Sequence, residues 1–75
     1  MNWKEHIHSD PDVLMGKPAI RGTRLSVEFL LGLYKMAWSE QQILENYPQL
    51  KSEDLKAVFS YLQDCIQDEL ILIRA

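Results

Sequence analysis

The stretch GKPAIRGTR, residues 16–24, separates two differently patterned parts of this 75-residue chain. It holds three of the eight basic residues, and no acid occurs between residues 13 and 27, although the formal net charge is −3. Before residue 25 proline and glycine recur too often for a long helix, so we expect an extended arm or a short β-hairpin over residues 1–25. The two strands of such a hairpin would fall at residues 5–8 and 18–21.

The remainder of the chain has the apolar spacing of three helices. Ser26, Ser39 and Ser52 are the expected N-caps, and Gln42 completes a capping box with Ser39. Pro48 is expected to end the second helix. The expected buried positions are Val27, Leu30, Leu31 and Tyr34 on the first helix, Ile43, Leu44 and Tyr47 on the second, and Leu55, Val58, Phe59, Leu62 and Ile66 on the third.

The pattern therefore predicts a mainly α fold in one domain, residues 1–75. A three-helix core at residues 26–67, compatible with a helix-turn-helix, follows the arm at 1–25, and an apolar tail occupies 68–75. The composition is that of an ordinary globular protein. The single cysteine, Cys65, fits a reducing compartment, and no signal-peptide or membrane-spanning run occurs, so we expect a cytoplasmic protein.

The charge distribution limits where nucleic acid would bind. Residues 1–38 carry five basic and four acidic side chains, a charge of +1, whereas residues 39–75 carry three and seven, a charge of −4. The candidate DNA contacts are therefore Lys17, Arg21 and Arg24 on the arm, with Lys56 and Ser60 on the third helix. Acids in the first turn of that helix would repel phosphate. The alternative is that the basic residues are solvated, or that Arg21 or Arg24 pairs with an acid.

No catalytic constellation is found, and no cofactor or metal site is expected. His6, His8 and Asp10 alternate as metal ligands on a strand would, but an exposed edge strand explains them equally. Cys65 lies beside an apolar stripe and is interpreted as a packed thiol. An enzyme is the least supported class.

Two apolar groups are candidates for an interface with a partner or a second copy. Phe29 and Leu33 lie on a second apolar stripe of the first helix, which has more apolar surface than one buried face needs. Four consecutive apolar residues near the end of the chain are unusual for a free surface. These residues are Leu70, Ile71, Leu72 and Ile73.

The basic stretch and its surroundings resemble the signature of the "domain of unknown function 433" family. The matching residues are Asp10-Pro11, Gly16-Lys17-Pro18, Ile20 to Arg24, Val27, Ser39, Ile43, Tyr47-Pro48, Leu50, Glu53-Asp54 and Ala57. The resemblance covers residues 6 to 64. The family usually has glycine where this chain has Ala37, at the end of the first helix. If that position is left-handed, alanine costs about 1 kcal/mol.

The resemblance implies a helix-turn-helix, homeodomain-like fold and an antitoxin of the VapB type. Such a protein neutralises a PIN-like ribonuclease toxin, binds its own promoter DNA and is expected to form a homodimer. Two alternatives remain open: a stand-alone helix-turn-helix DNA-binding regulator, and an orphan structural or interaction module whose basic residues serve the fold.

Overall fold

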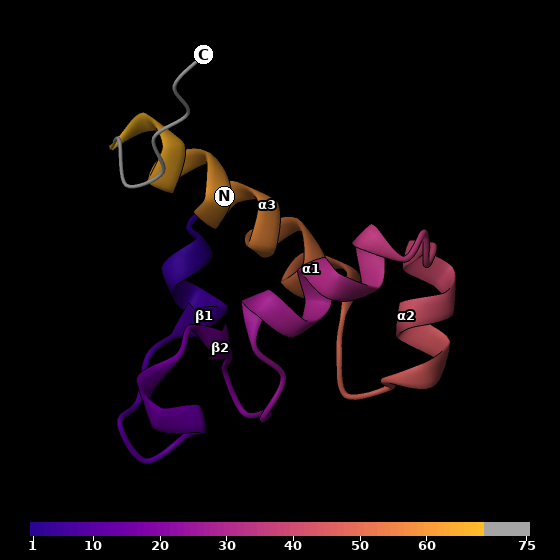
Figure 1. Ribbon diagram of the computed structural model, residues 1–75, viewed down its shortest axis with the longest axis horizontal. Coiled ribbons are helices and arrows are strands. Elements are labelled where there is room, and N and C mark those ends of the chain that lie inside the picture. The colour runs from indigo at the N-terminus through magenta and orange to yellow at the C-terminus, as the bar shows by residue number, and fades with distance from the viewer. Residues whose placement is uncertain (69–75) are drawn as a thin grey trace.

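A two-stranded antiparallel sheet near the N-terminus precedes three helices in the computed structural model, which describes residues 1–68 (Figure 1). The mainly helical fold with an N-terminal hairpin is thus confirmed. The strands are β1 (Ile7–His8) and β2 (Ala19–Ile20), and the helices are α1 (Val27–Lys35), α2 (Glu40–Asn46) and α3 (Ser52–Gln67). Single 3-10 turns occupy Trp3–Glu5 and Leu14–Gly16.

The hairpin is shorter than the sequence predicts. Ile7 pairs with Ile20 and His8 with Ala19, so only two residues of each strand join the ladder. Ile7 and Ile20 are buried and anchor the hairpin to the core. Gly22 has a φ of +78°, a left-handed conformation that glycine adopts without strain, and it turns the chain from β2 toward α1.

The N-terminal segment is folded onto α3 and does not extend as a free arm. The Trp3 indole Nε1 donates to Asp64 Oδ2 at 2.6 Å, and the Trp3 ring meets Tyr61 edge-on with centroids 4.8 Å apart. Further along, His6 Nδ1 lies 2.9 Å from Asp54 Oδ1. The extended-arm alternative is therefore wrong, because these side chains hold residues 1–8 against both ends of α3.

The first two helices start as the sequence predicts. The Ser26 hydroxyl accepts from the Phe29 amide at 2.9 Å. At α2, Ser39 Oγ accepts from the Gln42 amide at 3.1 Å, and Gln42 Oε1 accepts from the Ser39 amide at 2.8 Å, which completes the capping box. These caps depend only on residues three positions apart, and that is why the sequence reveals them.

The start of α3 differs from the prediction by one residue. The N-cap is Lys51, and Ser52 is already helical. The Asp54 carboxylate accepts from the Lys51 amide at 2.9 Å, so an acid at the third helical position satisfies that amide. Ser52 Oγ instead donates to Glu40 Oε1 at 2.7 Å and links α3 to α2.

The end of α1 confirms the expectation for Ala37. Its φ is +67°, in the left-handed region. The Ala37 amide donates to the Tyr34 carbonyl and the Trp38 amide to the Leu33 carbonyl, at 2.9 and 3.0 Å, which is the Schellman pattern. Alanine therefore occupies a position where glycine is favoured.

The core lies where the hairpin and the three helices meet. Its buried members are Ile7, Ile20, Val27, Leu30, Leu33, Ile43, Leu50, Leu55, Ala57 and Val58. On α1, Leu33 is buried while Leu31 and Tyr34 are only half-buried. On α3, Phe59 and Ile66 are exposed, contrary to the prediction. The C-terminal turns of α3 project beyond α1 (Figure 1), so within residues 1–68 no helix covers one side of α3.

Candidate interaction surfaces

The three basic residues of the stretch 16–24 have three different environments. Lys17 Nζ lies 3.4 Å from Glu28 Oε1, and both side chains are largely exposed. The pair borders a depression of about 260 Å³ whose apolar lining is Pro18, Val27, Leu31 and Tyr61. An exposed pair of this kind contributes little to stability, but Glu28 offsets the positive charge that Lys17 would present to a phosphate.

Arg21 serves the hairpin. Its Nε donates to the Lys4 carbonyl at 3.1 Å, and its Nη1 lies 3.5 Å from His8 Nδ1. The guanidinium therefore ties the end of β2 to the turn that precedes β1. The expected alternative, a pair with an acid, is not found for Arg21 within residues 1–68, where its partners are a carbonyl and an imidazole.

Arg24 forms no ion pair with any residue between 1 and 68. Its exposed side chain lines a depression of about 410 Å³ together with His8, Val13, Gly22 and Thr23. Arg24 is thus the member of the basic stretch that is available to a ligand.

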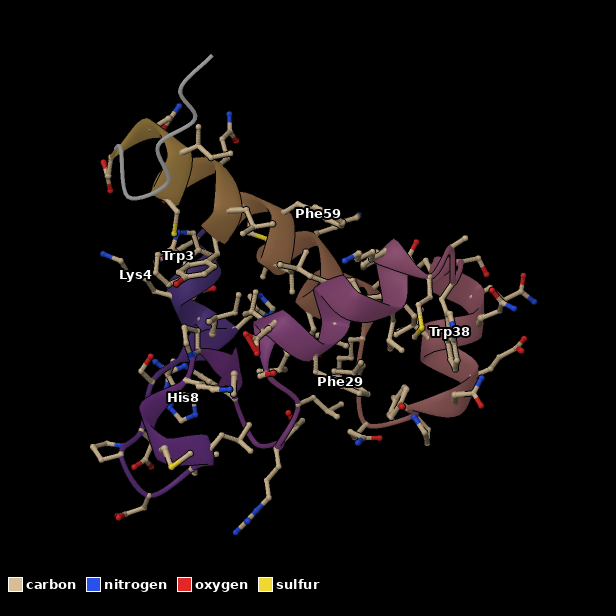
Figure 2. The ribbon with its side chains drawn as sticks, viewed as in Figure 1. Trp3, Lys4, His8, Phe29, Trp38 and Phe59 are labelled. Atoms are coloured by element: carbon tan, nitrogen blue, oxygen red, sulfur yellow. The ribbon has the colours of Figure 1, made fainter. Side chains whose placement is uncertain are left out.

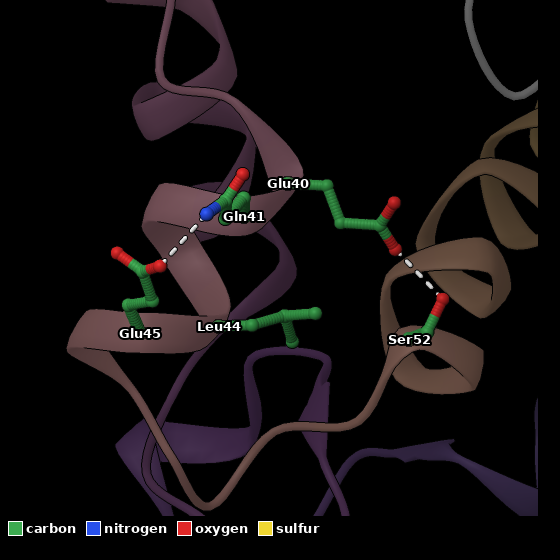
Figure 3. A pocket seen from close by; sticks show the side chains of 5 residues that line it. All are labelled: Glu40, Gln41, Leu44, Glu45 and Ser52. Atoms are coloured by element: carbon green, nitrogen blue, oxygen red, sulfur yellow. Dashed lines mark hydrogen bonds between the residues drawn. The ribbon is translucent and has the colours of Figure 1, made fainter.

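The surface between α2 and α3 is acidic. A depression of about 410 Å³ is lined by Glu40, Gln41, Leu44, Glu45 and Ser52 (Figure 3). Glu45 Oε1 accepts from Gln41 Nε2 at 2.9 Å, and Glu40 accepts from Ser52. A helix-turn-helix presents the start of its second helix to DNA, and carboxylates at that position repel phosphate.

The predicted DNA contacts on α3 provide little positive charge. Lys56 is exposed and Ser60 is half-buried, whereas Glu53 is exposed in the first turn. Lys56 and Ser60 belong to α3, whereas Lys17, Arg21 and Arg24 flank β2. None of the depressions described within residues 1–68 is lined by members of both groups.

An apolar strip on α3, which we call the α3 flank, consists of Phe59, Leu62 and Ile66. Phe59 is 50% and Ile66 59% exposed, and Leu62 between them is half-buried. Spacings of three and four residues place the three side chains on one side of the helix. Tyr34 of α1 meets Phe59 edge-on with centroids 5.1 Å apart, so the flank continues into the junction with α1 (Figure 2).

The other residues predicted to form an interface differ in their exposure. Phe29 is 43% exposed and meets Tyr47 edge-on at 5.7 Å between ring centroids. Leu33 is only 4% exposed, so its assignment to an interface is wrong; it packs in the core because α1 turns that side inward. Leu70, Ile71, Leu72 and Ile73 lie outside the described residues.

Two tyrosines near these surfaces have shifted titration. Burial, and secondarily the charge of Glu40, raises the pKa of Tyr34 above 10.0. Burial, followed by the hydrogen bond with Cys65, raises the pKa of Tyr61 above 10.0.

Among residues 1–68, no cluster of three potential metal ligands occurs. In the same part of the chain, no helix is long and apolar enough to cross a bilayer.

Two contacts that hold these surfaces in place escaped the sequence reasoning. They are the His6–Asp54 and Trp3–Asp64 pairs, whose partners are 48 and 61 residues apart. The sequence places His6 on a predicted strand and Asp54 in the first turn of the third helix. No periodicity in the sequence connects them.

Comparisons with known proteins agree with this architecture. Residues 7–62 match a family described as "Protein of unknown function (DUF433)". The "Uncharacterized protein y4eO" of Sinorhizobium fredii is 32% identical over 60 residues, which are 80% of this chain and 27% of that protein. The chain therefore spans about a quarter of the length of this curated relative.

A solved structure is similar as well. The crystal structure of a DUF433 member protein from Anabaena variabilis has a TM-score of 0.75 and 32% sequence identity, over 83% of this chain and 61% of that chain. Its similarity extends over the hairpin-and-helix architecture at an identity that supports common descent as well as a common fold. Because the family match spans 56 of the 75 residues, from 7 to 62, this protein belongs to the DUF433 family, whose function is not known.

Proposed function

We propose that this chain is a protein-binding module of the antitoxin type rather than an enzyme, and that it covers a PIN-like ribonuclease through the α3 flank. The observation that carries the proposal is the exposure of Phe59 and Ile66 on one side of α3. Aromatic and large aliphatic side chains at the centre of an interface supply most of its binding energy. The identity of the partner comes from the family resemblance alone.

The position of the flank supports a protein partner. Phe59 stands at the junction of α1 and α3, where Tyr34 supports its ring from one side. The neighbouring side of α3 is packed into the core, where Val58 and Cys65 are buried. A rigid helix with one packed and one apolar exposed face suits docking in a groove of a partner.

The charges around the α3 flank indicate which charge a partner should carry at the edge of its binding surface. Glu40 lies close enough to Tyr34 to raise its pKa, and the chain as a whole is net negative. A partner with basic residues around an apolar groove complements this surface, and its association rate should fall with salt.

Co-expression with the product of the neighbouring gene tests the proposal. The substitutions Phe59→Gln and Ile66→Gln together remove the flank but keep good helix formers. We expect the wild type to co-purify with the partner and relieve its toxicity, and the double variant to lose both. Met15→Asn is the matched control, because Met15 is 90% exposed at a φ of +56°, which asparagine tolerates.

The proposal fails if the wild type neither co-purifies nor relieves toxicity, or if the double variant is as effective as the wild type. Far-UV circular dichroism and thermal unfolding of the free double variant show whether the helices remain. A folded variant that has lost binding identifies the flank as the interface.

Promoter binding is the second candidate function, and it is favoured by the guanidinium of Arg24, which forms no ion pair within residues 1–68. The acidic surface between α2 and α3 opposes it, so we expect binding to a duplex from the upstream region to be weak and strongly salt-dependent. Anisotropy of a labelled duplex at several salt concentrations, with Arg24→Ala as the comparison, measures this. If Arg24→Ala binds the duplex with the affinity of the wild type, Arg24 does not contact DNA.

A further inference from the structure

We propose that the depression beside the β2–α1 turn, lined by His8, Gly22, Thr23 and Arg24, binds a phosphate group. The ligand is either a free or nucleotide phosphate or a phosphate of a nucleic-acid backbone. This site is separate from the α3 flank, and the inference does not depend on the antitoxin role.

The groups around the depression are hydrogen-bond donors. Arg24 contributes a guanidinium that forms no ion pair with residues 1–68. None of the five residues that line the depression is a carboxylate, whereas both other depressions described above contain glutamate. An anion can therefore approach Arg24 without meeting a negative lining residue.

The contact with Arg21 favours one position of the hydrogen on the His8 ring. Arg21 Nη1 can only donate, so the contact of 3.5 Å favours the form in which His8 Nδ1 accepts. In the neutral ring the hydrogen then lies on Nε2, which makes His8 a second donor beside Arg24. The same contact places the charge of Arg21 next to the His8 ring, and His8 lines the depression together with Arg24.

The turn that carries Arg24 is held rigid by its own hydrogen bonds. Thr23 Oγ1 donates to the Ile20 carbonyl at 2.9 Å and accepts from the Leu25 amide at 3.0 Å. The Ile20 amide in turn donates to the Leu25 carbonyl at 3.0 Å. The amides of Gly22 and Arg24 have no acceptor within residues 1–68, so the turn offers two backbone donors in addition to its side chains.

Gly22 leaves open space beside the turn in which a phosphate could bind. Its left-handed φ shapes the turn, and a Cβ built there meets no atom within 4 Å. The space above the turn is therefore open, so a ligand can approach the backbone closely at this point. Backbone amides in a turn can form an anion-binding concavity, and Arg24 adds a charged donor beside them.

A phosphate titration of the full chain, followed by ¹H–¹⁵N NMR at constant ionic strength with chloride as the balancing anion, tests the proposal. We expect saturable shifts of the Gly22, Thr23 and Arg24 amides. Arg24→Gln should weaken binding by about tenfold or more, because charge-assisted hydrogen bonds are roughly twice as strong as neutral ones. Lys35→Gln, which removes an exposed cation from the last turn of α1, is the matched control and should not change the affinity.

Two further ligands identify the source of the phosphate. A nucleoside monophosphate that binds as tightly as a single-stranded oligonucleotide indicates a small phosphorylated ligand. An oligonucleotide that binds much more tightly, with a steep salt dependence, indicates a nucleic-acid backbone. Shifts that do not saturate at the turn, or an unchanged affinity in Arg24→Gln, overturn the proposal. Neither result affects the test of the α3 flank, because Phe59 and Ile66 do not line this depression.

Discussion

At the scale of single residues, Ala37 is the clearest position where the local sequence and the backbone disagree. Its left-handed φ of +67° strains a residue with a Cβ, and the Schellman hydrogen bonds keep it there. Ala37→Gly should therefore raise the free energy of unfolding by about 1 kcal/mol. Chemical denaturation measures it, and a destabilised glycine variant would mean that the Ala37 side chain makes a contact that offsets the strain.

At Gly32, in contrast to Ala37, alanine should be more stabilising than glycine. It lies in the middle of α1, and a Cβ built there meets no atom within 4 Å. Gly32→Ala should stabilise the free protein by about 0.5–1 kcal/mol, because glycine loses more backbone entropy in a helix. Thermal unfolding is the measurement, and lower stability would show that α1 is contacted at Gly32 by another chain in solution.

Ionisation of Tyr61 should lower the stability of the protein at alkaline pH. Its folded pKa is raised above 10.0, so the neutral phenol contributes stability that is complete below pH 10 and is lost as pH rises through the folded value. We expect the free energy of unfolding to fall above about pH 10, and to fall less in Tyr61→Phe. Equal pH profiles for the two proteins would contradict the shift.

At the scale of elements, the His6–Asp54 pair determines how the hairpin sits on α3. Asp54 accepts from the Lys51 amide as well as from His6, so its removal affects both the helix start and the hairpin. Asp54→Ala should cost about 1–2 kcal/mol and His6→Ala less, since only the first also removes a cap. A double-mutant cycle separates the two effects; a coupling energy near zero would mean that the hairpin docks through its apolar residues alone.

The elements also show how far the sequence can predict this structure. The caps at Ser26 and Ser39 and the left-handed position at Ala37 depend on neighbours within four residues, and all three were predictable. The free arm was wrong because Trp3 and His6 find partners 61 and 48 residues away. Phe59, Ile66 and Leu33 were misassigned because periodicity gives the direction of a side chain and not the neighbour that covers it.

The candidate sites were predictable to a similar extent. The sequence located the basic stretch, but the structure gives its members different roles: Lys17 is ion-paired, Arg21 bonds within the hairpin, and Arg24 forms no ion pair within residues 1–68. His8 was noticed only as one of two alternating histidines, since its position beside Arg21 follows from the pairing of β1 with β2.

At the scale of the whole molecule, 75 residues form a small core, and association with a second copy is expected to add stability. Phe29 is exposed on α1, on a different helix from the α3 flank (Figure 2). We expect a homodimer in sedimentation velocity, and Phe29→Gln should shift it toward the 8.8 kDa monomer. A wild type that is monomeric at all concentrations, or a dimer that Phe29→Gln leaves intact, would contradict this arrangement.

The central claim is that the exposed side of α3 binds a protein. The most direct measurement is isothermal titration calorimetry of this chain against the purified product of the neighbouring gene, with wild type, the Phe59→Gln/Ile66→Gln variant and Met15→Asn. We expect saturable binding with a negative heat-capacity change for wild type and Met15→Asn, and a loss of affinity of about 100-fold or more in the double variant. Equal affinity for all three proteins, or no binding by the wild type, would contradict it.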